Sequence, residues 1–332
     1  MRFALRAAAM ASALAMACAA HAQIKVGIDL STTGPAASIG IPSKNTVLMW
    51  PATLGGQKAE YVILDDASDP SGAVRNFKKL TSEDKVDVIV GPNLTASALA
   101  VLDVIAETQT PMVALAASAV IVEPPEGKRQ WAFKMPQNDS HMATVLTQHM
   151  SDNGIKTVGF IGFADSYGDS WWKEFSNLAE ARKIKVVANE RFARTDTSVT
   201  GQVLKLMASR PDAILIAGAG TPAGLPQKVL VQRGYKGKIY QTHAAASQDL
   251  MRVGGKDVEG AYVVSGPALV AEQLPADNPS KAAAMDYVQG YEKLFGPGSR
   301  NQFSAHTYDA LLVLQQAVPV ALKKAQPGTP EF

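Results

Sequence analysis

Short runs of apolar residues alternate with longer segments in which apolar positions recur every three or four residues, from residue 24 almost to the end of the chain. The runs are typical of buried β-strands, and the longer segments are typical of helices. Strands are expected at residues 24–30, 59–64, 86–90, 112–115, 157–160, 185–189, 213–216, 238–241 and 260–264. Helices are expected between them, at 71–83, 96–107, 140–153, 170–182, 200–209 and 225–234. This alternation predicts parallel sheets with helices on both faces.

The number of expected strands bears on domain organisation. Nine strands over roughly 300 residues exceed what one hydrophobic core ordinarily holds, so we expect two lobes. The two halves also echo each other, because Asp87 and Asp212 each stand just before a buried strand. The predicted fold class is α/β, with two Rossmann-like lobes.

The first 22 residues have the features of a secretory signal peptide. Two arginines precede an alanine-rich apolar run, and a small-x-small pattern ends at Ala22. The run is too short to span a membrane, so we expect an exported protein that begins at Gln23. Lipid attachment at Cys18 is the alternative, although the residues before it lack the usual leucine. Cleavage after Ala22 removes the only cysteine and with it any disulfide.

Charge and motifs exclude several classes of function. The chain has 32 basic and 30 acidic residues, and loss of the signal peptide removes two arginines, which leaves a neutral protein with no basic stripe. Nucleic acid is therefore not an expected partner. The sequence has no phosphate-binding loop and no nucleophile elbow, and its histidines lack the spacing of metal ligands. We expect no catalytic residues, no cofactor and no metal.

Small and hydroxyl-bearing residues follow two neighbouring predicted strands. Asn93 and Thr95 follow the strand at 86–90, and Ala116 and Ser118 follow the next one. Ligands of open parallel sheets bind outside the carboxyl ends of the strands, where helix N-termini favour anions. The pattern predicts a cradle for a carboxylate. The alternative is a pair of ordinary turns that require small residues.

Several motifs, taken in order, resemble the periplasmic leucine/isoleucine/valine-binding protein family. They are the signal peptide, then IKVGI at 24–28, STTGPAASIG at 31–40, LDDASDP at 64–70 and DSYG at 165–168. Members are substrate-binding proteins of ABC importers with the type I periplasmic binding fold. The resemblance covers the mature chain and implies two lobes that close on a ligand in the cleft between them. It also implies a periplasmic monomer that delivers its ligand to an ABC permease in the inner membrane.

The resemblance assigns roles to individual residues of this chain. Thr95, Ala116 and Ser118 match positions that bind the ligand carboxylate, together with N–H groups around Asn93. Tyr167 matches the aromatic residue of the second lobe that covers the ligand on closure. These matches imply that carboxylate binding is preserved.

Three positions depart from the pattern of amino-acid binders. Ile39 replaces an aromatic residue of the first lobe, Thr221 stands near another aromatic position, and His243 stands where those proteins carry an acid that pairs with the ligand's ammonium. A buried ammonium needs a negative partner, and histidine supplies none. The sequence therefore predicts a small apolar or aromatic carboxylate without an α-amino group, such as an aromatic acid or a 2-oxo acid. The alternative is a branched-chain amino acid, with His243 at the rim and Asp249 beside the ammonium.

The resemblance also gives lobe boundaries and leaves other function classes open. Lobe one is expected at 23–137 plus 268–332, and lobe two at 138–267. Family members continue beyond the position of Phe332 through a third crossover, so the chain is expected to be truncated there. An exported enzyme that uses Ser118, His243 and Asp165 is one alternative, although nothing in their sequence context assembles a relay. A ligand-sensing subunit is the other alternative.

Overall fold

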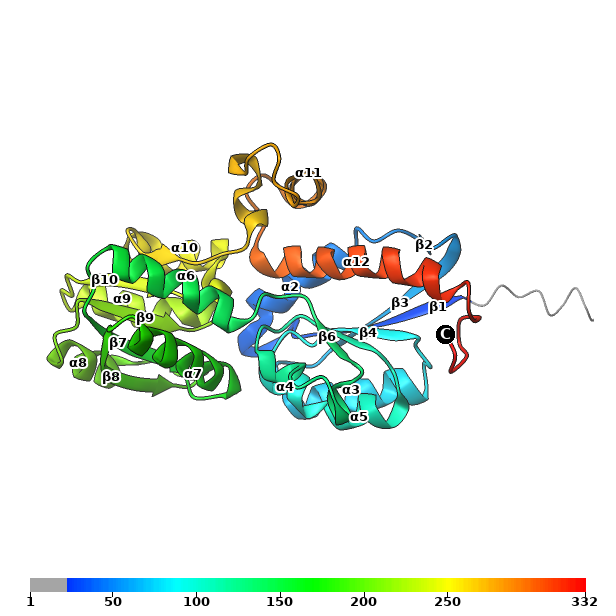
Figure 1. The fold of residues 1–332 in the computed structure, drawn as a ribbon, viewed down its shortest axis with the longest axis horizontal. Coiled ribbons are helices and arrows are strands. Elements are labelled where there is room, and N and C mark those ends of the chain that lie inside the picture. Colours follow the sequence, from blue (N-terminus) through cyan, green and yellow to red (C-terminus); the bar gives the residue numbers. More distant parts are fainter. Residues whose placement is uncertain (1–22) are drawn as a thin grey trace, which may run out of the picture.

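Two β-sheets form the framework of the protein (Figure 1). The computed structural model describes residues 23–332, so the expected signal peptide lies outside the described residues. The first sheet has the order β2-β3-β1-β4-β5-β6, with strands Thr53–Leu54, Gln57–Asp65, Ile24–Leu30, Val88–Val90, Met112–Ala114 and Ala132–Lys134. The second has the order β11-β10-β9-β7-β8, with strands Tyr262–Val263, Lys238–Gln241, Ala213–Ala217, Thr157–Phe163 and Lys185–Phe192. Apart from the antiparallel β2–β3 pair, all pairings are parallel, which confirms the expected α/β class.

The first sheet is covered by helices on both faces. Alternate side chains along each strand point to opposite faces, so Val88 and Val90 pack against one helical layer and Ile89 packs against the other. One layer holds α2 (Ala37–Val47) and α12 (Gln302–Ala321). The other holds α3 (Pro70–Ser82), α4 (Thr95–Ala100) and α5 (Leu102–Thr108). We call this sheet and its helices the first lobe.

The second lobe comprises the second sheet and its helices. These are α6 (Asp139–Asp152), α7 (Ser166–Ala181), α8 (Thr200–Ala208), α9 (Gly224–Gln232) and α10 (Gln248–Gly254). Its core includes the large buried side chains Trp171 and Phe175. Ile39 and Leu94 of the first lobe and Phe303 of α12 join the same cluster. The lobes therefore share a buried apolar contact.

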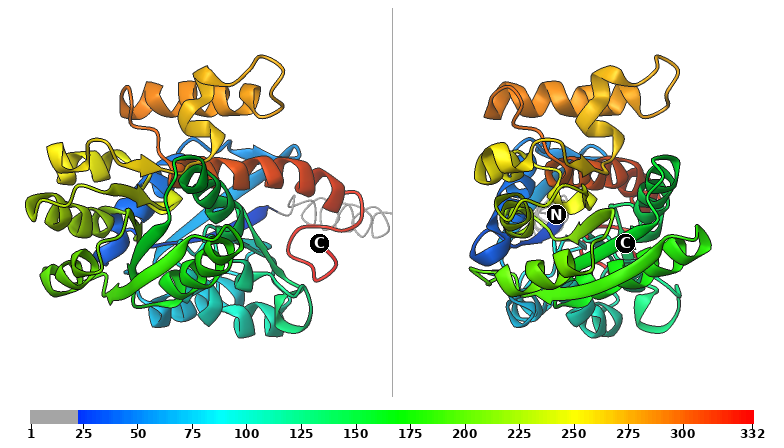
Figure 2. Two further views of the ribbon diagram at one scale, coloured as in Figure 1. Left: turned by 60° about the vertical axis from the view of Figure 1, so that its left-hand side comes forward. Right: turned by 90° about the vertical axis from the view of Figure 1, so that its left-hand side faces the viewer.

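A separate helical segment connects the second sheet to α12. It contains the 3-10 helix Pro267–Gln273 and α11 (Lys281–Phe295), which pack on each other and stand to one side of both sheets (Figures 1 and 2). Within residues 23–332, no helix is both long and apolar enough to cross a membrane. The expected lobe boundaries at 137/138 and 267/268 remain predictions.

Some elements differ from the expected ones for identifiable reasons. Helix α7 begins four residues earlier than expected, because the Asp165 carboxylate caps it by accepting from the N–H groups of Tyr167 and Gly168 at 3.0 and 3.1 Å. The helix expected at 96–107 is divided at Val101. Strand β6 was not expected, since it is a short edge strand whose central Phe133 is 54% exposed.

Candidate ligand-binding site

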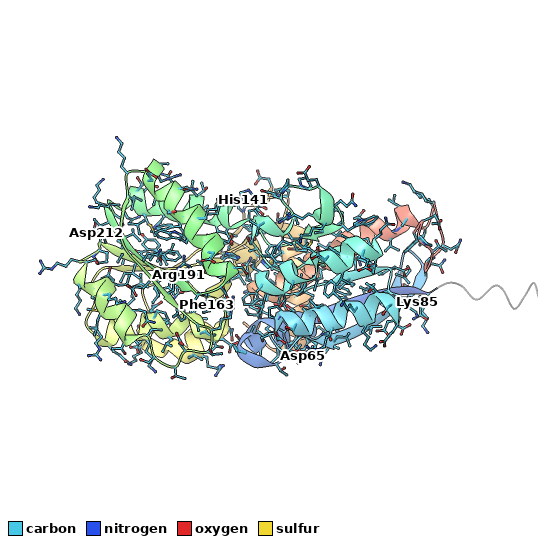
Figure 3. All side chains as sticks on the ribbon, turned by 90° about the horizontal axis from the view of Figure 1, so that it is seen from below. Asp65, Lys85, His141, Phe163, Arg191 and Asp212 are labelled. Carbon is cyan, nitrogen blue, oxygen red and sulfur yellow. The ribbon has the colours of Figure 1, made fainter. Side chains whose placement is uncertain are left out.

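The carboxyl ends of the strands in both sheets converge where the lobes meet. Asp65 at the end of β3 and Phe163 at the end of β7 lie toward this junction, whereas Lys85 and Asp212, which precede strands, lie at the outer ends (Figure 3). A cavity of about 30 Å³ lies at the junction. Most of its lining residues follow the ends of β4, β5, β7, β9 and β10. The site is therefore built from loops that follow the carboxyl ends of the strands in two open sheets.

Six of the eight residues predicted from the sequence line this cavity, namely Ile39, Asn93, Thr95, Ala116, Tyr167 and His243. Ser118 and Thr221 do not line it. The other lining residues were not predicted, and they are Leu94, Leu115, Ala117, Pro136, Arg194, Ala219, Ala244, Phe303 and His306. Several of these are chain neighbours of predicted residues. Phe303 and His306 come from α12 and carry no local signal in the sequence.

The side of the cavity in the first lobe offers a buried hydroxyl group. Thr95 is the first residue of α4, is 2% exposed, and its Oγ1 has no hydrogen-bond partner within the described chain. The Asn93 side chain is already engaged, because its Oδ1 accepts from the Ser31 N–H and its Nδ2 donates to Ser43 Oγ, both at 3.1 Å. Asn93 thus fixes the loop that carries Thr95. A buried hydroxyl without a partner is suited to donate to a ligand carboxylate.

Tyr167 forms part of the opposite wall. Thr242 Oγ1 donates to the Gly218 carbonyl at 2.9 Å, so its single proton is committed, and it accepts from the Tyr167 hydroxyl at 2.9 Å. Burial raises the pKa of Tyr167 well above its usual value, so the phenol stays protonated. Tyr167 therefore contributes an aromatic ring to the cavity wall and a hydroxyl oxygen that can still accept a hydrogen bond.

His243 is a neutral imidazole. It opens the 3-10 helix His243–Ala245, is 3% exposed, and lies beside the rings of Trp171 and Tyr167, with ring centroids 5.8 and 6.5 Å away. Burial lowers the pKa of His243 to about 3. A neutral ring has one donor and one acceptor nitrogen, and Nδ1 has no partner among residues 23–332. His306 approaches the cavity from α12, with its Nε2 held 2.9 Å from Gln302 Nε2.

The cavity contains a cationic residue but no acidic one. Arg194 is its only lysine or arginine, and no aspartate or glutamate of the described chain lines it. Its Nε donates to Asp165 Oδ2 at 2.7 Å, and its guanidinium carbon lies 4.1 Å from the centre of the Phe163 ring. Asp249, the alternative partner for an ammonium, does not line the cavity and is paired with Arg252 at 2.7 Å. The wall therefore carries one guanidinium, and the charge of this group is paired with Asp165 behind it.

The two predicted residues outside the lining make other contacts. Ser118 Oγ donates to Ser170 Oγ of the second lobe at 2.8 Å. The Thr221 N–H donates to Ser38 Oγ of the first lobe at 3.0 Å. Both residues were expected to touch the ligand, whereas in this structure their polar groups join the lobes.

Comparison with known proteins identifies the family. The profile of the periplasmic binding protein family matches residues 23–331. The chain is 46% identical to an extracellular ligand-binding receptor from Rhodopseudomonas palustris HaA2, with a TM-score of 0.90 over 93% of this chain and 86% of that one. It is 26% identical to the Leu/Ile/Val-binding protein BraC3 of Rhizobium johnstonii, over 83% of this chain and 75% of that protein.

A further solved structure shares the fold. It is a solute-binding protein of an ABC transporter from Rhodopseudomonas palustris BisB5 in complex with 3,4-dihydroxybenzoic acid, with 22% identity and a TM-score of 0.79 over 92% of this chain and 82% of that one. Members of the family bind ligands and are not enzymes. The chain belongs to the periplasmic binding protein family, as a type I protein related to the leucine/isoleucine/valine-binding proteins.

Proposed function

We propose that this protein is the extracytoplasmic substrate-binding protein of an ABC importer. It captures a small apolar or aromatic carboxylate without an α-amino group in the cavity between its lobes, closes over it, and delivers it to a permease of the inner membrane. The observation that carries the choice of ligand is the composition of the cavity wall, which has an arginine and the neutral His243 but, among the described residues, no acidic one.

An amino acid would bring a positive ammonium into this environment. Removing an ammonium from water costs several kcal/mol unless a carboxylate or several acceptors surround it. Here the wall offers an ammonium no carboxylate, and its Arg194 guanidinium, although paired with Asp165, favours an anion over a cation. A carboxylate instead gains the hydroxyl of Thr95, and a hydrogen bond to a charged group is stronger than one between neutral groups.

The rest of the cavity favours a hydrocarbon body. Ile39, Leu94, Leu115 and Phe303 contribute apolar walls, and the ring of Tyr167 adds an aromatic face. As in most small-molecule sites, these apolar groups predominate and only a few polar groups stand among them. The neutral imidazole of His243 offers a donor and an acceptor to a hydroxyl, a ketone or a second carboxylate.

Related proteins carry both ligand chemistries. One relative is named for leucine, isoleucine and valine, and one structural neighbour holds 3,4-dihydroxybenzoic acid. The first of these supports the second candidate function, branched-chain amino-acid uptake. The absence of aspartate and glutamate from the described lining of the cavity favours a carboxylate ligand that has no amino group.

Capture proceeds by closure of the two lobes. The ligand carboxylate binds first to the first lobe near Thr95, and the second lobe then brings Tyr167 and His243 over the remainder. The apolar contact of Ile39 and Leu94 with the second lobe accompanies this closure. Excluding water strengthens each polar contact inside, and the closed form is the one that a permease recognises.

The test uses ligand pairs that differ only in the amino group. Isothermal calorimetry compares 3-phenylpropionate with phenylalanine and 4-methylpentanoate with leucine, and includes 3,4-dihydroxybenzoate as a phenolic acid. We expect at least one acid to bind and its amino-acid twin to bind at least about 100-fold more weakly, which corresponds to about 2.7 kcal/mol. Equal or tighter binding of leucine or phenylalanine would refute the assignment in favour of amino-acid uptake.

A substitution at His243 tests the same reasoning from the protein side. His243→Asp supplies the missing carboxylate and is expected to reverse the preference within each ligand pair, because an anion then faces the ammonium. His243→Gln is the matched control, since it keeps a neutral donor and acceptor and adds no charge. A preference that His243→Asp leaves unchanged would show that the ammonium position lies elsewhere.

A further inference from the structure

The segment between β6 and α6, which connects the two lobes, begins at a lysine without an ion pair. Lys134 is the last residue of β6, its side chain is half-buried, and its Nζ donates to the Pro136 carbonyl at 2.6 Å. Among the described residues, no carboxylate oxygen lies within 4.0 Å of this Nζ. Arg194, by contrast, is paired with Asp165 at 2.7 Å. Lys134 therefore carries a charge that no adjacent carboxylate offsets.

Pro136 brings this ammonium to the back of the cavity wall. Pro136 lines the cavity, so Lys134 forms a hydrogen bond with a residue of the wall although it does not line the cavity itself. The charge of Lys134 also reaches the interior. The pKa of His243, which lines the cavity, is lowered by burial first and then by His306 and Lys134. A group that disfavours a positive charge on His243 favours a negative charge on a ligand beside it.

Two carboxyl groups, those of Asp139 and Glu123, face Lys134 from beyond 4.0 Å. Asp139 lies in the first turn of α6 and is 1% exposed, and burial raises its pKa to about 7, so it is largely uncharged at about pH 6. Glu123 is exposed, so water and salt screen its charge. Burial lowers the pKa of Lys134 to about 8, which leaves the ammonium charged at about pH 6. In mildly acidic solution the buried part of this cluster is therefore positive.

We propose that Lys134 is a specificity-determining charge, which acts from behind the cavity wall and makes the site favour a carboxylate over a neutral or cationic group. This inference rests on the proposed function, in which the ligand is an anion. A unit charge roughly 10 Å from a carboxylate, at the effective dielectric constant of about 20 that is typical of proteins, favours the anion on the order of tenfold. Arg194 and Lys134 thus share the selection of anions, and the charge of Lys134 is the one without an ion pair.

A charge that serves ligand selection has a different signature from a residue that serves the fold. A half-buried ammonium without a carboxylate partner is costly to the ligand-free protein, so an apolar side chain of the same length should be neutral or stabilising there. Loss of the charge should weaken the binding of anionic ligands and leave neutral ones unaffected. A residue needed only for the fold would instead lower stability when replaced and would not distinguish between charged and neutral ligands.

The experiment compares Lys134→Met, which removes the charge and keeps the length of the side chain, with Lys134→Arg, which keeps the charge. Lys238→Met is the matched control, because Lys238 is also half-buried and its Nζ donates to Asn153 Oδ1 at 3.0 Å, at the outer end of the second lobe. Calorimetry at about pH 6 gives the Kd of 3-phenylpropionate, and competition against it gives the Kd of the neutral 3-phenylpropionamide. Urea unfolding measures the stability of each ligand-free protein.

We expect Lys134→Met to raise the Kd of the acid about tenfold, to leave that of the amide within about twofold, and to be at least as stable as the wild-type protein. Lys134→Arg should restore most of the affinity for the acid, and Lys238→Met should bind both ligands normally. If the amide binds too weakly to measure, the acid alone decides, because loss of the charge is what separates Lys134→Met from Lys134→Arg.

Two outcomes would overturn the inference. One is a Kd for the acid in Lys134→Met that matches those of the wild-type protein and Lys238→Met. The other is an equal rise for the acid and the amide, because such a change reflects packing and not charge. Failure of the proposed function is distinct, since the wild-type protein would then bind leucine and neither 3-phenylpropionate nor 3,4-dihydroxybenzoate. That result is read on the wild-type protein alone, whereas failure of the inference leaves wild-type binding of the acid intact.

Discussion

Replacing Thr95 by valine is expected to weaken ligand binding and to stabilise the ligand-free protein. Valine keeps the shape of threonine and exchanges only the hydroxyl for a methyl group. The Thr95 hydroxyl is buried and has no partner in the part of the chain described, so its removal breaks no hydrogen bond of the fold. Burying an unpaired hydroxyl costs about 1–3 kcal/mol. We expect a gain near 1 kcal/mol, the low end, because the adjacent cavity admits water.

The loss in binding follows from the charge of the ligand. A hydrogen bond to a charged group contributes about 1.5–3 kcal/mol, and a loss of about 2 kcal/mol raises the Kd roughly 30-fold. At a ligand concentration 100 times the wild-type Kd, the ligand stabilises the wild-type protein by about 2.7 kcal/mol. The same concentration would stabilise Thr95→Val by only about 0.9 kcal/mol.

Chemical denaturation with and without ligand measures both effects, and calorimetry gives the Kd directly. Thr147→Val is the matched control, because Thr147 is buried in α6 and donates to the Ala143 carbonyl at 2.8 Å. That variant loses an internal hydrogen bond, so it should be slightly less stable and bind normally. A Thr95→Val protein that retains the wild-type Kd would show that this hydroxyl does not meet the ligand.

Three further predictions concern charge and backbone space. Burial raises the pKa of Asp139 to about 7, so between about pH 4 and 7 the native protein holds a proton that the unfolded chain releases, and stability falls as pH rises through this window. Asp139→Asn should remove about 3 kcal/mol of that fall, measured as the difference in unfolding free energy between pH 4.5 and 8. Gly168→Ala would place its Cβ 1.9 Å from the Phe163 carbonyl oxygen, so urea unfolding should show that the free energy of unfolding falls by about 3 kcal/mol. Gly201→Ala is the control, because its Cβ meets nothing within 4 Å, and this variant should be as stable as the wild-type protein or more stable. Arg194→Gln should weaken carboxylate binding about tenfold, with a smaller dependence on salt in calorimetry, and an unchanged Kd would remove its charge from ligand recognition.

The spacing of apolar residues predicted the strands of the two sheets well, because burial of these strands dictates that spacing. The strands expected at 24–30 and 238–241 match β1 and β10 to the residue, since their side chains are almost all buried. Capping is a second signal that periodicity does not include. The carboxylate of Asp165 starts α7 four residues before the apolar pattern does, and this shift moves Tyr167 from a turn into the first turn of a helix.

The candidate site was predictable only as far as it is local. Asn93, Thr95 and Ala116 follow strands, so the position of each strand end locates them. His306 reaches the cavity from α12, more than 60 residues after β10, and only tertiary packing brings it there. Ser118 was assigned to the correct strand end, but the direction of its hydroxyl depends on Ser170 in the other lobe.

The neighbourhood of His243 gives the protein a built-in optical reporter. Trp171 is fully buried with its ring against His243, whereas Trp172 packs on Phe160, farther along the same lobe. Indole emission responds to the polarity and motion of its surroundings, so a ligand seated beside His243 changes the light that Trp171 emits. Arrival and departure of an unlabelled ligand can therefore be followed in real time, with a Trp171→Phe protein as the blank.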